Sequence, residues 1–386
     1  MTVKRAKQIK KLEFVNWIEQ TVHLPIGLAA VPGQITLPVY LREVAASMVA
    51  PDVERLTIQK SARVGYSTLL SSLIAWHLTE APAPVLLVLP AELDCRNAVI
   101  SLEDTFDTSP NLQGRLPMPS NMARLERNNL LFRRGKNGAS LRLVGATAPR
   151  NLRAVTAKIL LIDECDALLD TSEGDAITLA IARTFTFPDR KIIVGGTPLA
   201  EATSHVGREY RESDQRVFEI ACPACSGWFE IEWSCIQWPE GRTAEAHCVC
   251  LACGGVIEES SKAELVSAGR WRATRLDADP THRGYRINSL VSGLANATWA
   301  KLAAEYVKVK DDEHQLKVFT NNVLGLPWSN EQADEVNEAA LMGRVEAFDL
   351  DRIPAAVLAM TCGVDVQKDR LEATICGWAR AMAPAL

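Results

Sequence analysis

Four short apolar runs constrain the fold of this chain more than any other feature. They alternate with segments of helical character, and each is long enough for a buried strand but too short for a buried helix. Runs this short and uninterrupted are typical of strands covered on both faces, so the sequence predicts a parallel α/β sheet between residues 56 and 198. The runs are LTIQ at 56–59, VLLVL at 85–89, KILLI at 158–162 and KIIVG at 191–195.

Two strand-like arms flank Asn137-Gly138 within residues 130–145, and this dipeptide is a strong signal for a tight hairpin turn. Residues 1–50 combine a basic opening, an amphipathic stretch and the helical pattern YLREVAASM, and we interpret them as an N-terminal appendage. The opening lacks the apolar core of a secretory signal, and no run approaches the roughly 18 residues of a membrane span. We therefore expect a cytoplasmic chain without a membrane partner.

Residues 60–67 lie between a predicted strand and the predicted helix STLLSSLIAWHL, which is the setting of a phosphate-binding loop. The loop departs from the usual pattern, because Tyr66 stands where the lysine is expected and Lys60 where the first glycine is expected. Phosphoryl transfer needs a cation at the β- and γ-phosphates and a hydroxyl on Mg²⁺. Lys60 or Arg63 would supply the cation and Ser67 the hydroxyl; the alternative is an ordinary turn between a strand and a helix. The predicted nucleotide-binding residues are Lys60, Ser61, Ala62, Arg63, Val64, Gly65, Tyr66 and Ser67.

Two carboxylates follow the third apolar run. Asp163 would bind Mg²⁺, and Glu164 would orient and deprotonate the attacking water. Thr197, in the Gly-Gly-Thr-Pro that ends the fourth run, would sense the γ-phosphate. Taken singly, these residues also fit a solvated acidic turn and a plain Gly-Pro turn. Because three strand ends together present what phosphoryl transfer needs, the sequence predicts an ATPase with Glu164, Asp163 and Arg63 as candidate catalytic residues.

Two Cys-x-x-Cys pairs lie 24 residues apart, in a chain that contains ten cysteines and no secretory signal. Four thiolates paired in this way form a closed tetrahedral site, which suits structural Zn²⁺ and leaves no open position for catalysis. Cys248 competes with Cys250 as a ligand, but the spacing favours Cys250. The alternative is a set of buried thiols or a redox pair. The predicted zinc ligands are Cys222, Cys225, Cys250 and Cys253.

Residues 115–158 contain ten lysines and arginines and one acid, so their net charge is +9 in a chain of net charge −5. Such a segment can neutralise phosphates without contacting bases, which makes DNA the natural polymer partner. The alternative is a solvated hairpin whose cations pair with acids elsewhere in the chain.

The motifs together resemble one family, the large subunit of tailed-phage terminases of the lambda-like GpA type. QKSARVGYS at 59–67 resembles that family's deviant Walker A, residues 150–168 its Walker B region and GGTP at 195–198 its coupling motif. The paired cysteines, RGYRINSL at 283–290 and the stretch from Trp299 to Trp328 are similar to its central region. The resemblance implies an α/β P-loop ATPase of the ASCE or RecA-like class, with a zinc ribbon, followed by an RNase H-like nuclease that binds two metal ions.

This resemblance divides the chain into five parts. They are an N-terminal appendage (1–50), a P-loop ATPase domain (51–220), a zinc ribbon (221–256), a helical linker region (257–355) and a truncated start of the nuclease domain (356–386). Residues 363–367 and 371–375 resemble the first nuclease hairpin, with Asp365 as its first metal ligand. We expect Asp369 in the turn, and Glu372 with its side chain turned away from the metals. A single acid cannot hold two metals, so we expect no endonuclease activity from this chain.

The resemblance implies a motor that uses ATP, Mg²⁺ and Zn²⁺ to package double-stranded viral DNA in the host bacterial cytoplasm. Its partners would be the terminase small subunit, the procapsid portal and further copies of itself on DNA. One alternative is a DEAD-like helicase or remodeller, but it needs a second RecA-like lobe, whereas residues 256–360 suggest helices around a tryptophan-rich core. The other is a non-enzymatic zinc-ribbon DNA-binding remnant of a prophage.

Overall fold

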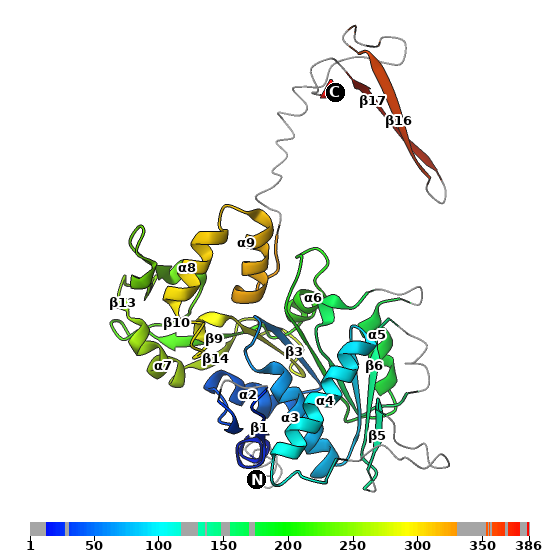
Figure 1. Cartoon of the computed structure of the whole chain (residues 1–386), viewed down its shortest axis with the longest axis vertical. Helices are drawn as coiled ribbons and strands as arrows, with labels where there is room; N and C mark the ends of the chain where they lie inside the picture. Colours follow the sequence, from blue (N-terminus) through cyan, green and yellow to red (C-terminus); the bar gives the residue numbers. More distant parts are fainter. Residues whose placement is uncertain are drawn as a thin grey trace. The chain divides into compact units, whose positions relative to one another are not determined.

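In the computed structural model, the four predicted apolar runs form neighbouring parallel strands (Figure 1). In spatial order they are β3 (Arg55–Lys60), β8 (Lys191–Gly196), β7 (Ile159–Ile162) and β4 (Pro84–Leu89). Each neighbouring pair is hydrogen-bonded in parallel register. The predicted parallel α/β sheet is therefore confirmed.

The structure describes part of the chain, which divides into two units, Met1–Trp328 and Ser329–Leu386. The described residues are 13–27, 31–116, 130–135, 137–147, 155–169, 174–329, 353, 355, 357–366, 370–378 and 384–385. Within these ranges, no helix is long and apolar enough to cross a membrane.

Ten strands of the described part form the main sheet. Outside the four central strands, β6 (Ser140–Gly145) pairs in parallel with β4, and β15 (His282–Ile287) pairs in parallel with both β3 and β9 (Arg216–Ala221). The antiparallel strands are β5 (Phe132–Arg134) on β6, and β10 (Trp228–Glu230) and β14 (Arg270–Ala273) on β9. Because β5 and β6 flank Asn137-Gly138, the predicted hairpin is confirmed.

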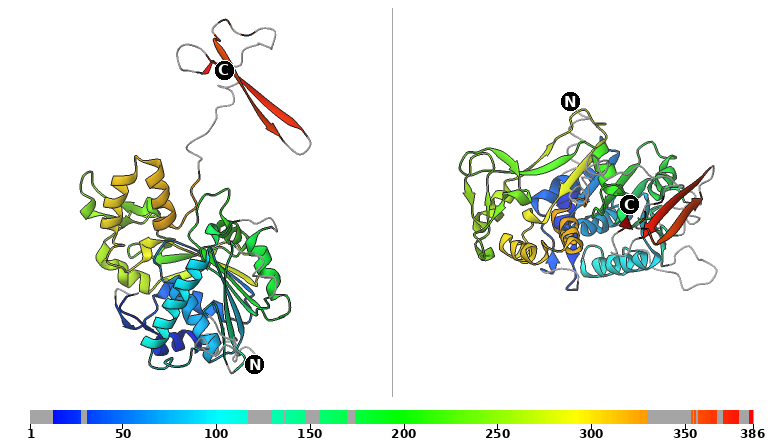
Figure 2. Two further views of the ribbon diagram at one scale, coloured as in Figure 1. Left: turned by 45° about the vertical axis from the view of Figure 1, so that its right-hand side comes forward. Right: turned by 90° about the horizontal axis from the view of Figure 1, so that it is seen from above.

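Helices cover both faces of the sheet (Figure 2). Val85 and Leu87 of β4 join a core cluster that includes side chains of α2, α3 and α4, whereas the alternate residues Leu86 and Val88 join a second cluster with α5. This period of two is what a strand buried on both faces requires. The helices are α2 (Val39–Met48), α3 (Tyr66–Thr79), α4 (Glu92–Thr108), α5 (Ala176–Ile181) and α6 (His205–Glu212).

The N-terminal segment is part of the main core. Phe14 and Trp17, in the helical residues 13–21, place their rings 5.4 and 5.3 Å from that of Trp76 on α3. Tyr40 and Val44 of α2 are buried. Beyond the helices, β1 (His23–Leu24) pairs with β2 (Gly33–Gln34). The described residues before 50 thus complete the first unit through apolar contacts.

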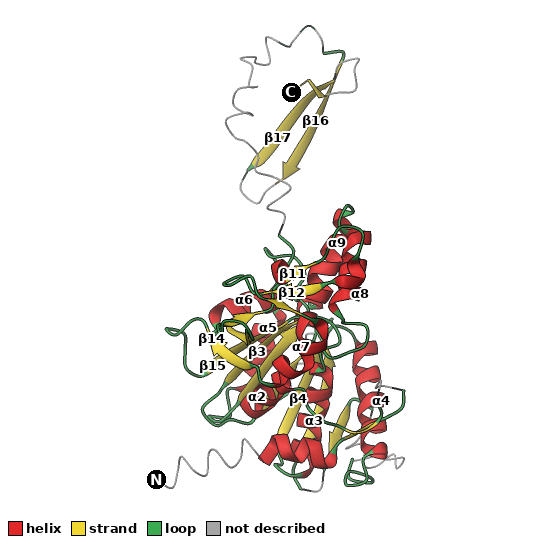
Figure 3. Ribbon diagram, turned by 90° about the vertical axis from the view of Figure 1, so that its left-hand side faces the viewer, coloured by secondary structure: helices red, strands yellow, loops and turns green. Residues whose placement is uncertain are grey.

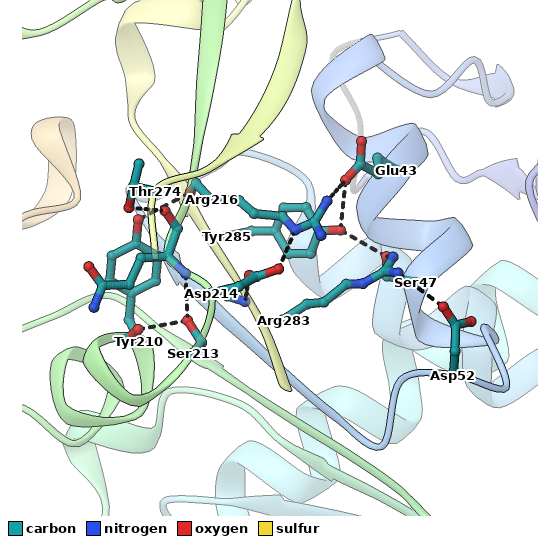
Figure 4. A network of polar contacts seen from close by, with 12 residues as sticks. Glu43, Ser47, Asp52, Tyr210, Ser213, Asp214, Arg216, Thr274, Arg283 and Tyr285 are labelled. Atoms are coloured by element: carbon teal, nitrogen blue, oxygen red, sulfur yellow. Dashed lines mark hydrogen bonds and ion pairs between the residues drawn. The ribbon is translucent and has the colours of Figure 1, made fainter. Parts of the chain in front are cut away.

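Strand β15 corrects the predicted helical linker at 257–355, because it lies inside the main sheet between β3 and β9. A network of polar contacts connects it to α2 and β9 (Figure 4). The Tyr285 hydroxyl lies 2.8 Å from Ser47 Oγ, and Arg283 Nη1 donates to the same oxygen at 2.9 Å. Arg216 Nη1 donates to Glu43 at 2.6 Å. The polar side chains of β15 thus have partners, so the strand can lie inside the sheet without a continuous apolar run.

The rest of the first unit consists of a small sheet and the helices that follow it, and Figure 3 labels β11, β12, α7, α8 and α9 in this region. Strands β11 (Ile236–Gln237), β12 (His247–Val249) and β13 (Val256–Ile257) form a small antiparallel sheet. The rings of Trp233, Trp238, Tyr306 and Phe319 pack together and join this module to the helices that follow. Those helices are α7 (Glu259–Ser267), α8 (Trp299–Val309), α9 (Glu313–Phe319) and a π-helix (Thr320–Leu324). Short 3₁₀ turns occur at Cys165–Ala167, Ala182–Thr184, Trp233–Cys235, Thr243–Glu245 and Ser289–Val291.

The second unit contains an antiparallel hairpin of β16 (Ala359–Val366) and β17 (Leu371–Trp378), with β18 (Pro384–Ala385) paired to β17. The predicted strands at 363–367 and 371–375 fall in this hairpin, apart from Gln367. Both Gln367 and Asp369 lie outside the described residues.

Candidate functional site

The segment Lys60–Ser67 turns sharply between the end of β3 and the start of α3. Two of its residues adopt left-handed backbone, Arg63 at φ 62° and Gly65 at φ 95°. Such alternation turns successive N–H groups toward one side, which is how backbone forms an anion-binding concavity at a helix N-terminus. A Cβ at Gly65 would lie 2.9 Å from Leu41 Cδ1. Glycine therefore suits this position both for its left-handed backbone and for the lack of space for a side chain.

Three strand ends bring the predicted chemical groups together. Lys60 Nζ lies 2.9 Å from Glu164 Oε1 and 3.4 Å from Thr197 Oγ1. Ser67 donates to Asp163 Oδ2 at 3.2 Å, next to this contact. The side-chain amino group of Lys60 is almost buried, whereas Glu164 is close to half exposed. One ammonium group, two hydroxyl groups and two carboxylates therefore meet at the carboxyl edge of the sheet, where α/β folds bind ligands.

The two carboxylates are held in different environments. Burial raises the pKa of Asp163 to about 6, although the nearby Lys60 ammonium opposes this shift. A buried carboxylate of this kind is stabilised by a divalent cation. Glu164 adopts left-handed backbone at φ 50°, a conformation that costs energy for a non-glycine residue and is concentrated at functional sites.

Tyr66, which replaces the expected lysine, is buried, and Lys60 Nζ lies 5.7 Å from the centre of its ring. Its hydroxyl donates to the Ile162 carbonyl at 3.4 Å. A Cβ at Gly195 would lie 2.4 Å from Tyr66 Cζ, so the first glycine of Gly-Gly-Thr-Pro gives space for this ring. Lys60 reaches the acidic pair instead. Arg63 is exposed on the cavity wall, and among the described residues its side chain has no hydrogen-bond or ion-pair partner.

A cavity of about 1000 Å³ opens from this loop. Its walls include an apolar strip around Ile35 and Tyr40, and the helical residues Lys317 and Asn322. Sequence reasoning missed both walls, because it assigned them to an appendage and a linker. Their own residues carry no local signal for nucleotide binding; only the sheet topology places them beside the loop.

The loop is fixed by two segments from much later in the chain. The Ser61 N–H donates to the Ile287 carbonyl at 2.8 Å, and the Ala62 N–H donates to the Asn322 carbonyl at 2.8 Å. The Ser61 and Ser289 hydroxyls lie 3.0 Å apart. These contacts give the RGYRINSL motif and Asn322 a physical role, since both fix the start of the phosphate-binding loop.

The four predicted cysteine ligands form one cluster, with all their Sγ atoms within 4.8 Å of one another. Cys222 and Cys253 Sγ lie 3.7 Å apart, close to the roughly 3.8 Å edge of a tetrahedron with Zn–S bonds of about 2.3 Å. The two Cys-x-x-Cys turns have the same backbone hydrogen bond. Ser226 N–H donates to Cys222 O, and Gly254 N–H donates to Cys250 O, both at 2.8 Å. Cys248 lies outside the cluster, which therefore fits a closed four-thiolate metal site.

The acid pair of the second unit differs from the prediction. Asp365 on β16 lies directly opposite Glu372 on β17. Directly paired residues of an antiparallel ladder project from the same face, so Glu372 shares a face with Asp365, whereas its side chain was expected to turn away from the metals.

The predicted basic segment is partly neutralised within the chain. Arg115 pairs with Glu80 at 2.8 Å, and Lys158 pairs with Asp189 at 2.5 Å. Arg133 is buried and pairs with Glu103. At these three positions the alternative of internally paired cations holds. Five other members lie outside the described residues, namely Arg124, Arg127, Lys136, Arg150 and Arg153.

Comparison with known proteins relates this chain to phage terminase large subunits. It is 25% identical over 401 residues to the terminase large subunit of Escherichia phage lambda, covering 94% of this chain and 60% of that protein. It is 24% identical over 395 residues to that of Enterobacteria phage P21, covering 95% and 60%. The chain thus spans about 60% of the length of these relatives. Its fold is similar to the crystal structure of the HK97 bacteriophage large terminase, with a TM-score of 0.52, 12% identity and coverage of 97% and 66%.

Two family models cover most of the sequence. The phage terminase large subunit gpA, ATPase domain, matches residues 29–271, and the terminase large subunit gpA, endonuclease domain, matches residues 282–384. The first model ends within β14 and the second begins at β15, although both strands belong to one sheet. Since the first model alone covers more than half of the sequence, the chain belongs to the phage terminase large subunit gpA family.

Proposed function

We propose that this chain is the ATP-hydrolysing motor of a phage terminase, which translocates double-stranded viral DNA into procapsids. The observation that carries the proposal is the meeting of Lys60, Glu164 and Thr197 within 3.4 Å contacts at the floor of the 1000 Å³ cavity. Ser67 and Asp163 lie beside them. This set supplies each group that phosphoryl transfer from ATP needs.

The residues divide the work in the following way. Ser67 and Asp163 would hold Mg²⁺, which would neutralise the charge that develops on the phosphates. Lys60 would face the β- and γ-phosphates, with Arg63 as a second cation from the loop. Glu164 would accept the proton of the attacking water, so its contact with Lys60 must open before it can act as a base. Thr197 would hydrogen-bond near the γ-phosphate.

The four cysteines Cys222, Cys225, Cys250 and Cys253 would bind one structural Zn²⁺. The two cysteine pairs are far apart in sequence, and a bound zinc ion would join them. It would thereby fix the carboxyl end of β9 and the turns that follow it. The site has no open position, so we assign it no catalytic step.

The partners follow from the family. We propose double-stranded DNA as the substrate track, and the terminase small subunit, the procapsid portal and further copies of this chain as protein partners, in the host bacterial cytoplasm. The relatives are terminase large subunits of phages lambda and P21, which supports this assignment.

Measuring ATP hydrolysis with and without duplex DNA separates the candidate functions. A motor is stimulated by duplex without separating its strands. A DEAD-like helicase would unwind the duplex, and it needs a second RecA-like lobe; within the described residues the parallel strands all belong to one sheet. A prophage remnant that only binds DNA would show no turnover.

We also propose that the 386 residues alone lack endonuclease activity. Two-metal cleavage needs several carboxylates around a shared metal pair. The described hairpin offers Asp365 and Glu372 on one face. Incubation with plasmid and Mn²⁺ tests this proposal, and cleavage that disappears in an Asp365→Ala variant would contradict it.

A further inference from the structure

We propose that Lys317 on α9 contacts the γ-phosphate of bound ATP. It would add to Lys60 and Arg63 a cation that comes from outside the phosphate-binding loop. This inference rests on the proposed ATPase function. Lys317 lines the same cavity as Lys60, Arg63 and Glu164, although about 250 residues separate it from the loop.

The position of α9 is fixed against the γ-phosphate end of the site. Asn322, at the end of the same helical segment, accepts the Ala62 N–H at 2.8 Å. Asn321 Nδ2 donates to the Leu199 carbonyl at 2.9 Å, two residues beyond Thr197. Lys317 lies on α9, which continues directly into the π-helix that contains Asn321 and Asn322. Lys317, Thr197 and Leu199 all line the same cavity.

The charges around the cavity leave this amino group available. Lys60 is already engaged by Glu164 at 2.9 Å. Asp166, another acid on the cavity wall, accepts the backbone N–H groups of Leu199 at 2.8 Å and Val206 at 2.7 Å. Among the described residues, no side chain pairs with Lys317, which is half-buried. A half-buried ammonium group without a carboxylate partner, on the wall of a cavity of about 1000 Å³, favours an anionic ligand.

A γ-phosphate contact has a specific signature. It strengthens binding of ATP more than of ADP and leaves AMP unaffected, since only ATP presents a phosphate at the Thr197 end. A charge-assisted hydrogen bond of ordinary strength corresponds to a factor of about ten or more in affinity. We therefore expect Lys317→Ala to weaken binding of a non-hydrolysable ATP analogue by about tenfold, with a much smaller change for ADP.

The experiment compares Lys317→Ala, Lys317→Arg and Lys308→Ala in the full chain, by calorimetric titration with the analogue, ADP and AMP in Mg²⁺. Lys308 is an exposed lysine on the neighbouring helix α8 and does not line the cavity, so its variant should match the wild type. Lys317→Arg keeps the charge and should retain most of the preference for the triphosphate. Equal melting temperatures would show that the variants remain folded.

The outcomes separate this inference from the proposed function. A wild type that binds the analogue, a Lys60→Ala variant that does not, and a Lys317→Ala variant with wild-type affinities would overturn only this inference. Equal losses for analogue, ADP and AMP would also overturn it, because they indicate general damage to the cavity. Weakened duplex binding with an unchanged ATP-to-ADP ratio would place Lys317 on DNA instead. A wild type that binds no nucleotide would overturn both proposals.

Discussion

The ammonium group of Lys60 lies 2.9 Å from a carboxylate oxygen of Glu164, across 104 residues of sequence. The two side chains neutralise each other at the floor of the cavity, and Glu164 also lies 3.5 Å from the Thr197 N–H. The contact joins the proposed phosphate-binding cation to the proposed general base. A phosphate that attracts Lys60 would therefore release Glu164, so nucleotide binding and activation of the base are physically linked.

Glu164→Gln should separate binding from chemistry. The amide keeps the shape of the side chain but cannot accept a proton from water, so turnover should fall by at least about a hundredfold. ATP affinity should be retained or rise, since the amide no longer competes for the Lys60 charge. Single-turnover hydrolysis and equilibrium binding measure the two effects. A variant that hydrolyses ATP at the wild-type rate would remove Glu164 from the role of base.

Lys60→Ala and Arg63→Ala identify which loop cation faces the phosphates. Lys60 is buried beside Glu164 and Thr197, whereas Arg63 is exposed. We expect Lys60→Ala to weaken ATP binding by about tenfold or more, and Arg63→Ala to act mainly on turnover. Titration with a non-hydrolysable analogue distinguishes the variants. Normal binding and hydrolysis by Lys60→Ala would refute the displaced-lysine interpretation.

Metal analysis should find one Zn²⁺ per chain, bound by the four clustered cysteines. Cys222→Ser should abolish stoichiometric zinc and destabilise the 222–255 module, because metal-binding energy contributes directly to folding of such sites. Cys376→Ser is a matched control, since Cys376 lies on the exposed hairpin of the second unit. Protein purified without chelators that contains no zinc would contradict the assignment.

Features that were predictable from the sequence depend on local pattern. The four apolar runs identify central strands because strands buried on both faces need apolar residues at consecutive positions. Asn137-Gly138 identifies the hairpin because its turn needs left-handed backbone, and Gly138 has φ 88°. The cysteine pairs are recognisable because ligand spacing is set by metal geometry.

The remaining features depend on distant partners. Strand β15 reads HRGYRI, and its two arginines are tolerated because Arg286 pairs with Glu230 at 2.5 Å and Arg283 with Asp52 at 3.2 Å. Both acids lie far from β15 in the sequence, so the residues near the strand do not reveal them. Lys317 likewise lines the cavity only because of how α9 packs. Glu372 lies on the same face as Asp365 only because of the register of the hairpin.

Stability should decrease as the pH is lowered from about 6.5 to about 4. Burial lowers the pKa of both His77 and His282 from 6.5 to about 4. The unfolded chain therefore binds protons near pH 6.5 while both folded rings stay neutral, and the folded state loses stability across this window by up to about 3 kcal/mol per ring. His282→Gln can keep the contact that the imidazole makes with Thr57 at 2.9 Å, but it does not titrate.

We therefore expect the unfolding free energy of His282→Gln to fall less than that of the wild type between pH 6.5 and 5, with parallel curves above pH 7. Urea unfolding across this range measures the difference. A variant whose pH dependence equals that of the wild type would show that His282 does not contribute to it.

Gly325→Ala should damage the nucleotide site from outside the loop. Gly325 has φ 64°, and a Cβ there would lie 2.8 Å from the Ser61 nitrogen and 2.9 Å from the Ile287 oxygen. Both are backbone atoms, and they form the hydrogen bond that fixes the start of the loop. An alanine must therefore separate β15 from the loop or move the 320–328 segment, in addition to the cost of left-handed backbone. We expect a loss of unfolding free energy of about 2 kcal/mol or more, together with weaker ATP binding.

Gly293→Ala is the matched control, because Gly293 is exposed and a Cβ there would meet nothing within 4 Å. Its stability and ATP affinity should equal those of the wild type. Chemical denaturation and analogue titration on both variants give the comparison. If Gly325→Ala is destabilised but binds ATP normally, the 320–328 segment stabilises the fold without positioning the loop. If Gly325→Ala binds ATP normally and is as stable as Gly293→Ala, the close approach of Gly325 to Ser61 has no energetic consequence.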